Sequence, residues 1–310
     1  MIKIDLVTGF LGSGKTTLIK KYAHYLIEKG NKIGILENDF GAVNVDMMLL
    51  QELQGDHCNI ETVAGACDAD CHKRRFKTKL IAMGMSGYDR VIVEPSGIFD
   101  IDEFFDSLNE EPLDHWYEAG SVITVVDAES EDKLSEQSEY LLASQCANAG
   151  MIILSKTQKC NEQQIQATVS HINNALNNIQ CRRTVDNDVF IKNWEDLNDD
   201  DYEKMMSCGY KNESYVKKYS DSYPYRSLYF INQKISIDEL SETAKNMLSD
   251  KSYGDIFRIK GFVLNDSQYY ELNATHQNIN TAPVDRGQEI IIVIGENLNK
   301  EKISSLLEKA

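Results

Sequence analysis

Eight residues near the start of the chain, Gly9 to Thr16, constrain the fold more than any other stretch. They read GFLGSGKT, and their three glycines let the backbone curl and turn several N–H groups toward one anion. An apolar run, Ile2 to Val7, precedes them, and apolar residues at the spacing of one helix face follow. A glycine-rich loop between a buried strand and a helix is typical of a phosphate-binding loop. The sequence therefore predicts that the chain binds a nucleoside triphosphate.

The side chains of this loop have distinct expected contacts. Lys15 reaches the β- and γ-phosphates, and the Thr16 hydroxyl ligates Mg²⁺. The residues expected to bind the nucleotide here are Gly12, Ser13, Gly14, Lys15, Thr16 and Thr17.

Charge and composition exclude several other functions. The 310 residues carry 49 acidic and 32 basic side chains, a formal net charge of -17, which argues against nucleic-acid or anionic-membrane partners. No apolar run approaches the roughly 18 residues of a membrane span, and no signal peptide is evident. The seven cysteines are an odd number in a long chain and favour a reducing setting. We therefore expect a cytoplasmic protein.

Strand and helix patterns alternate through the first 193 residues. Short apolar runs near residues 32–37, 90–93, 121–126 and 151–154 read as buried strands, with helical patterns between them. This alternation predicts an α/β domain over 1–193, the doubly wound, mostly parallel sheet of a P-loop NTPase. An acidic and tyrosine-rich stretch, 194–225, reads as a linker with weak or induced structure. Residues 226–310 then read as a small α+β domain.

Polar clusters follow several of these strands, where the loops of a parallel sheet converge. Glu94 takes the position of a Walker-B-type acid that holds Mg²⁺ or orients the attacking water, and Gly97 offers a backbone N–H to the γ-phosphate. Asp39 is the first candidate for a switch residue whose position depends on the γ-phosphate, and Asp46 is the second. A strand-ending turn or a helix-capping carboxylate is the plainer alternative for each.

The segment Ser155-Lys156-Thr157-Gln158 follows a strand where a base-reading loop belongs. GTPases carry Asn-Lys-x-Asp there, and the Asp accepts two bonds from guanine. In this chain Ser155 replaces the Asn and Gln158 replaces the Asp, while Lys156 remains to lie over the base. GTP is therefore the favoured nucleotide, and ATP remains open.

Two cysteines form a candidate metal loop. Cys67 and Cys71 are separated by three residues, and Asp68, Asp70 and His72 add further donors. Thiolates with imidazole suit Zn²⁺ and also Co²⁺ or Ni²⁺. A single pair needs a third ligand such as Glu37 or Cys58, or a partner chain. Two loop cysteines without a metal are the alternative.

In series, these motifs resemble the CobW-type family of P-loop GTPases, whose members include metallochaperones and cobalamin-related proteins. GFLGSGKTT, from Gly9, looks like the family's phosphate loop, and ENDFG, from Glu37, is similar to its ENEFG segment. EPSG, from Glu94, resembles its E-x-S/T-G, and FRIKGF, from Phe257, looks like part of its C-terminal domain.

The resemblance implies GTP hydrolysis coupled to delivery of a transition metal to a client metalloprotein or a cofactor pathway. Glu37, Cys67 and Cys71 would hold the metal, and the γ-phosphate would order the loops around it. The family's Cys-x-Cys-Cys is Cys67-Asp68-Ala69-Asp70-Cys71 here, so one thiolate is lost and acids are added. Either the metal binds through Cys67, Cys71 and a third group, or the metal preference differs, and such changes are typical of a distinct subgroup with its own client.

Two other functions remain open from the sequence. The second domain could serve as the substrate lid of a small-molecule kinase, and the altered base loop leaves room for a nucleotide-gated assembly protein with little catalysis. The sequence leaves the oligomeric state open, a homodimer included.

Overall fold

The computed structural model of the protein describes residues 1–10, 12–38, 49–63, 69–95, 101–129, 134–186, 188–217, 225–265, 267–276, 278–284 and 289–308. The chain divides into two compact units, Met1–Lys218 and Tyr219–Ala310. Among the described residues, no helix combines the length and apolar character that crossing a membrane requires.

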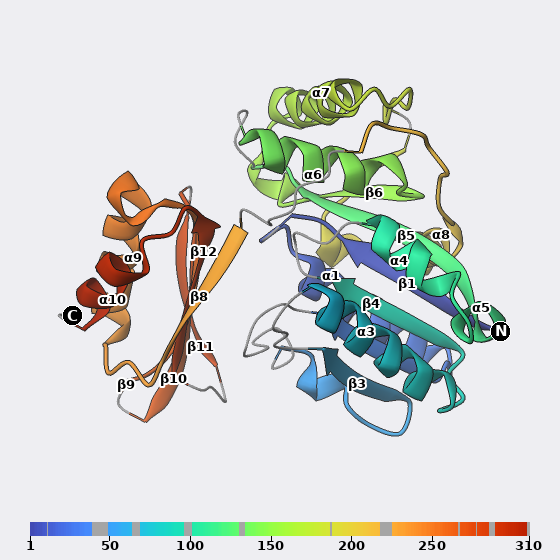
Figure 1. The fold of residues 1–310 in the computed structure, drawn as a ribbon, viewed down its shortest axis with the longest axis horizontal. Coiled ribbons are helices and arrows are strands. Elements are labelled where there is room, and N and C mark those ends of the chain that lie inside the picture. The colour runs from blue at the N-terminus through green and yellow to red at the C-terminus, as the bar shows by residue number, and fades with distance from the viewer. Residues whose placement is uncertain are drawn as a thin grey trace. The chain divides into compact units, whose positions relative to one another are not determined.

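The first unit is built on a seven-stranded sheet in the order β3-β2-β4-β1-β5-β6-β7 (Figure 1). Every neighbouring pair in it is parallel, and the strands are near-continuous apolar runs, as a sheet covered on both faces requires. Its strands are β1 (Ile2–Thr8), β2 (Ile33–Asn38), β3 (Cys58–Val63), β4 (Arg90–Pro95), β5 (Tyr117–Asp127), β6 (Met151–Ser155) and β7 (Val189–Ile191).

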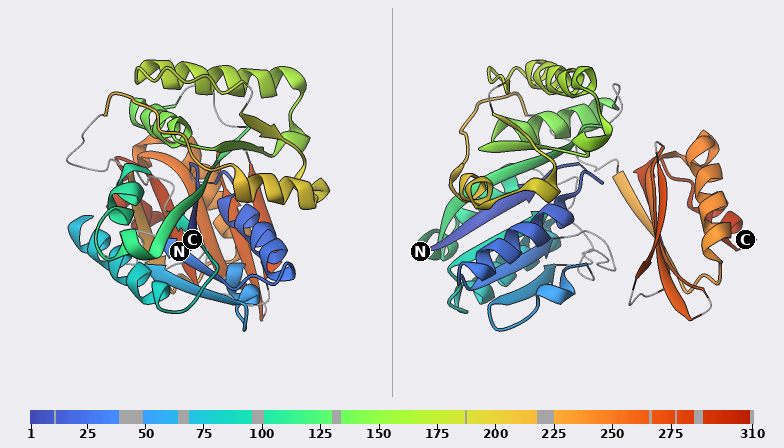
Figure 2. Two further views of the ribbon diagram at one scale, coloured as in Figure 1. Left: turned by 90° about the vertical axis from the view of Figure 1, so that its right-hand side faces the viewer. Right: turned by 180° about the vertical axis from the view of Figure 1, so that it is seen from behind.

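Helices cover both faces of this sheet. α1 and α8 pack into the core on one face and turn toward the viewer in the right-hand view of Figure 2, whereas α3, α4, α6 and α7 bury the other face. The helices are α1 (Lys15–Glu28), α3 (Ala69–Gly84), α4 (Ile101–Leu108), α5 (Leu113–Trp116), α6 (Glu136–Ala147), α7 (Glu162–Asn178) and α8 (Asp199–Ser207). Three 3-10 turns join them, η1 (Gln51–Leu53), η2 (Thr157–Lys159) and η3 (Trp194–Asp196).

The stretch expected to be a weakly structured linker is partly folded onto the first unit. α8 begins with a capping box in which Asn198 and Asp201 exchange side-chain bonds with each other's backbone N–H groups. Met205 is fully buried against the core of the α1 face, and Tyr202 stacks on Tyr25 of α1 at 4.8 Å between ring centroids. The acidic residues concealed this helix, because three of them form its first turn, where they favour the helix dipole.

The second unit is a five-stranded antiparallel sheet in the order β11-β10-β9-β12-β8. One face packs against α9 (Ile237–Ser249) and α10 (Lys300–Leu307), and η4 (Lys251–Tyr253) precedes β9. The strands are β8 (Tyr225–Ile231), β9 (Asp255–Asn265), β10 (Gln268–Ala274), β11 (Ile279–Val284) and β12 (Ile290–Glu296). The predicted class, a doubly wound parallel sheet followed by a small α+β domain, is confirmed.

Candidate nucleotide site and metal loop

The glycine-rich loop runs from the end of β1 to the start of α1 and needs glycine at two positions. Gly14, the residue before α1, has a φ of 101°, which lies in the left-handed region. Gly9 has a φ of 142°, and a Cβ added there would lie 2.2 Å from the carbonyl oxygen of Val125. Lys15 is buried, and its Nζ donates to the carbonyl oxygens of Gly9 at 2.9 Å and Phe10 at 3.3 Å. The Lys15 side chain therefore lies across the glycine-rich loop.

A hydrogen bond joins this loop to the strand-end acid. The Thr16 hydroxyl donates to Glu94 Oε1 at 2.9 Å, across 78 positions of sequence. Glu94 is buried near the carboxyl end of β4, and Thr16 is the second residue of α1. A hydroxyl beside a carboxylate is the hard oxygen donor set that Mg²⁺ prefers, so the residues fit that ion. Thr17, by contrast, is exposed.

Glu37 lies beside Glu94 on the neighbouring strand. The two residues are partners in the parallel register of β2 and β4, so their side chains leave the same face of the sheet. Two positions earlier on each strand, Ile35 and Ile92 pack in the core under α1, which identifies this face as the one that carries α1. The fold thus brings Glu37, Glu94 and Thr16 together, and Glu37 and Glu94 are both buried.

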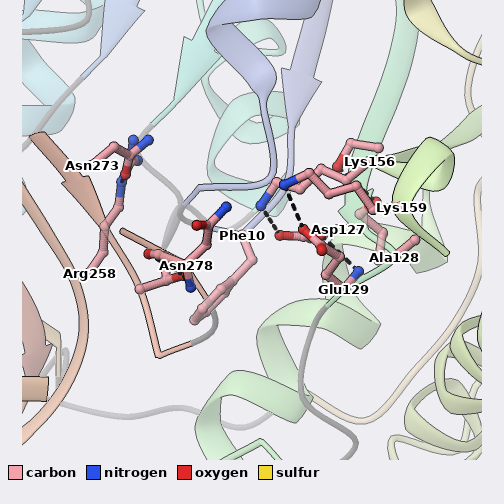
Figure 3. Close-up of polar contacts among 12 residues, drawn as sticks. Phe10, Asp127, Ala128, Glu129, Lys156, Lys159, Arg258, Asn273 and Asn278 are labelled. Carbon is pink, nitrogen blue, oxygen red and sulfur yellow. Dashed lines mark hydrogen bonds and ion pairs between the residues drawn. The ribbon is translucent and has the colours of Figure 1, made fainter. Parts of the chain in front are cut away.

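The base loop is anchored by ion pairs (Figure 3). Lys156 forms a close ion pair with Asp127 at the end of β5, and Lys159 pairs with Glu129 at 3.5 Å. Ser155 is buried and its hydroxyl donates to the carbonyl oxygen of Val126 at 3.4 Å, whereas Gln158 is exposed. Lys156 adopts a left-handed φ of 58°. Asp127 was not a candidate from sequence, although its place at a strand end was a usable signal.

The metal loop is described only in part. Asp39, Asp46, Gly97 and Cys67 lie outside the described residues, while Cys71 is half-buried in the first turn of α3. His72 is buried, and burial, with a smaller effect from Arg75, lowers its pKa to about 4, so its imidazole is neutral near pH 7. Within the described part of the chain, no three His, Cys, Asp or Glu side chains gather closely enough to hold a metal ion.

Cys58 is removed from the candidate ligand set. It begins β3 opposite Ile33, the first residue of β2, whereas Glu37 pairs with Thr62 four residues further on. At a rise of about 3.3 Å per residue, Cys58 is about 13 Å from the level of Glu37, toward the opposite edge of the sheet. Burial also raises the pKa of its thiol to about 11. The alternative of Cys58 as third ligand is therefore wrong, because β3 separates Cys58 from the Cys67–Cys71 loop, and the short distance in sequence concealed this strand.

Three buried polar atoms around the loop have no hydrogen-bond partner among the described residues. They are Thr8 Oγ1, Ser13 Oγ and Trp194 Nε1. Native proteins pair most such atoms, so their gathering beside a glycine-rich loop indicates a binding site. Trp194 was not a candidate from sequence, because it stands at the start of the acidic stretch.

Comparison with known proteins matches each of the two units to a CobW-type family model. Residues 3–185 match the model of the CobW/HypB/UreG nucleotide-binding domain, and residues 229–310 match the cobalamin synthesis protein CobW C-terminal domain. The zinc chaperone YjiA of Escherichia coli is 34% identical over 174 residues, covering 52% of this chain and 51% of that protein. The zinc chaperone CobW of Sinorhizobium is 27% identical over 183 residues, covering 50% of this chain and 51% of that protein.

The chain thus aligns with about half the length of these relatives. Among solved structures, zinc-bound YjiA GTPase from E. coli is 19% identical with a TM-score of 0.40, covering 99% of this chain and 98% of that one. The family models carry the assignment, because the nucleotide-binding model alone matches more than half of the chain. The chain belongs to the CobW/HypB/UreG family of nucleotide-binding proteins and carries a CobW C-terminal domain.

Proposed function

We propose that the protein is a cytoplasmic GTPase that binds a divalent transition metal, zinc in the first instance, and delivers it to a client protein or cofactor pathway. One observation carries the proposal: Thr16 of the phosphate loop bonds to Glu94, and Glu94 is the register partner of Glu37. A nucleotide group and a candidate metal ligand are thus one strand apart. The names of the relatives, several of them zinc chaperones, support the metal as cargo.

Nucleotide binding starts with the loop. Lys15 exchanges the carbonyl oxygens of Gly9 and Phe10 for the β- and γ-phosphates, whose negative charge makes its hydrogen bonds stronger. The loop N–H groups and the N-terminus of α1 bind the remaining phosphate oxygens. Mg²⁺, held by Thr16 and by Glu94 directly or through water, would neutralise the charge that develops as the γ-phosphate leaves. Asp39 and Gly97 are proposed to respond to that phosphate.

The base side of the site favours GTP. Lys156 lies over the base while its ion pair with Asp127 fixes the loop. Gln158 offers an amide oxygen where GTPases use a carboxylate, so it accepts one guanine N–H without a charge. We therefore expect the protein to prefer GTP over ATP, but less strongly than a GTPase that has an Asp at this position.

The metal is proposed to bind Glu37, Cys67 and Cys71, with the nucleotide state setting how tightly. Because Glu37 neighbours Glu94, movement of the Thr16–Glu94 contact on nucleotide binding shifts the position and field at Glu37. A soft thiolate pair with one carboxylate suits Zn²⁺, and also Co²⁺ or Ni²⁺. The client then takes the metal when hydrolysis loosens the site.

Zinc titration of purified protein tests this function. The Cys67→Ser/Cys71→Ser double variant should bind zinc at least about 10-fold more weakly than wild type, because losing even the groups that only orient metal ligands weakens binding by about 10–100-fold. The Cys208→Ser variant, which alters another half-buried cysteine, should match wild type. Wild-type affinity should also differ between the GDP state and a non-hydrolysable GTP analogue. Equal zinc affinity in the double variant and wild type would overturn the metal assignment.

A further inference from the structure

Trp194 lies against the phosphate loop although it is distant in sequence. A Cβ added at Gly14 would meet Trp194 Cη2 at 2.9 Å and Cζ3 at 3.2 Å, so the tip of the indole ring covers the residue before α1. The same added Cβ would lie 3.9 Å from the Cβ of Ser155, the first residue of the base loop. Trp194 therefore lies where the phosphate loop meets the base loop.

The fold holds Trp194 in this position from both sides. β7 ends at Ile191 beside the carboxyl end of β6, so the loops that follow these strands emerge at the same edge of the sheet. Asn193 caps the 3-10 turn that Trp194 begins, accepting a bond from the N–H of Glu195. Glu195 in turn pairs with Lys21 of α1 at 3.1 Å. These contacts link the turn that Trp194 begins to α1.

The indole N–H is buried and has no hydrogen-bond partner among the described residues. An unpaired buried donor is unfavourable by about 1–3 kcal/mol, and native structures pair most such groups with protein, ordered water or a ligand. An indole N–H only donates, so the ligand atom it meets must be an acceptor. In the nucleotide function proposed above, Lys15 and the loop N–H groups bind the phosphates, so the nucleoside is left to supply this acceptor.

We propose that Trp194 forms a wall of the nucleoside subsite and donates its indole N–H to an acceptor of the bound base or ribose. Trp194 thereby complements Lys156 of the base loop and contributes to affinity for the nucleoside, in addition to the phosphate contacts. This subsite rests on the nucleotide function proposed above.

Two kinds of ligand separate a nucleoside contact from a structural role. GDP carries the base and ribose, whereas inorganic tripolyphosphate carries phosphates alone. Trp194→Phe keeps an aromatic ring and removes the N–H, so calorimetric titration should show GDP affinity lowered about five-fold and tripolyphosphate affinity unchanged. Equal losses for both ligands, or no loss for GDP, would overturn the proposal.

Tryptophan fluorescence gives a second readout with an internal control. The chain has two tryptophans, and Trp116 packs instead against Gly84 of α3. In the Trp116→Phe variant, GDP should still change the emission of the remaining Trp194, while GDP affinity stays at the wild-type value. In Trp194→Phe, the remaining emission from Trp116 should not respond. A response confined to Trp116 would contradict the assignment, and failure of wild type to bind any nucleotide would contradict the proposed function instead.

Discussion

Two buried polar clusters in the first unit differ in how completely their atoms are paired. The Asp5 cluster joins Asp5 of β1, Tyr22 of α1, Arg90 of β4 and the backbone N–H of Ser121. Arg90 Nη1 donates to both Asp5 oxygens at 2.7 and 2.6 Å, Tyr22 donates at 2.9 Å, and the Ser121 N–H donates at 2.8 Å. Each Asp5 oxygen thus accepts two bonds.

The loop cluster, by contrast, contains Thr8, Ser13 and Trp194, each with a buried polar atom that no described residue pairs. The polar atoms of both clusters are buried, so burial of these atoms alone does not separate the clusters. The clusters differ in how their hydrogen bonds are paired. A fully paired network stabilises and specifies the fold, whereas unpaired donors and acceptors are typical of a site that binds a ligand. The comparison predicts that substitutions in the Asp5 cluster reduce stability, whereas substitutions in and beside the loop cluster reduce function.

Replacing Arg90 should have the largest effect. Arg90→Met leaves the fully buried Asp5 without its cation and should lower the free energy of unfolding by about 3–5 kcal/mol. Urea denaturation would measure this loss, and the exposed Arg182→Met variant should remain near wild type. Nucleotide affinity of the folded fraction should not change.

The same variant has a predictable pH dependence. Burial raises the pKa of Asp5, and Arg90 opposes that rise. Without Arg90 the pKa of Asp5 in the folded state is higher still. A carboxyl whose pKa is raised by folding makes the protein less stable as the pH rises above the pKa that this carboxyl has in the unfolded state. The deficit of Arg90→Met relative to wild type should therefore be larger at pH 8 than at pH 5, and a smaller deficit at pH 8 would contradict this.

Glu94→Gln should separate function from stability. The change removes a carboxylate that lies beside Thr16 and Glu37, so GTP hydrolysis should fall about 10²-fold. The melting temperature should stay equal or rise, because one of two adjacent buried acids is neutralised. Phosphate release and calorimetry would measure both, with the exposed Glu118→Gln as control. Loss of stability with hydrolysis intact would reverse the roles of the two clusters.

Tyr22→Phe tests the Asp5 cluster with the loss of a single hydroxyl. The hydroxyl is buried and donates to Asp5, so its removal should lower the free energy of unfolding by about 1–2 kcal/mol. Hydrolysis should match wild type when corrected for the folded fraction. An unchanged stability would show that the cluster is less tightly coupled than its geometry indicates.

Ser13→Ala is the matched substitution in the loop cluster and should have the smallest effect on stability. It removes a buried hydroxyl without a partner among the described residues, so the melting temperature should stay the same or rise slightly. GTP affinity should fall by only a few-fold. A stability loss as large as that of Tyr22→Phe would remove the distinction between the clusters.

The sequence predicted much of this site because its strongest signals are local. The spacing of Gly9, Gly12, Gly14 and Lys15 belongs to one turn, and the place of Glu94 follows from a strand of consecutive apolar residues. The meeting of Thr16 with Glu94 required only that loops at one edge of a parallel sheet converge.

The remaining features depend on register and packing, which a single sequence does not encode locally. β3 alternates polar and apolar residues, so it was missed, and with it the separation of Cys58 from Glu37. β11 is polar and carries Pro283 at the sheet edge, where a strand needs no apolar pattern. Trp194 was assigned to a linker because the acidic residues after it read as solvated, although they cap and begin α8.

Release of free phosphate from GTP in the presence of Mg²⁺ tests the central claim most directly. Wild type should release phosphate, faster from GTP than from ATP, and Lys15→Met should release none above background while remaining folded. Tight binding of GTP by wild type without phosphate release, or transfer of the phosphate to a small molecule, would contradict the account.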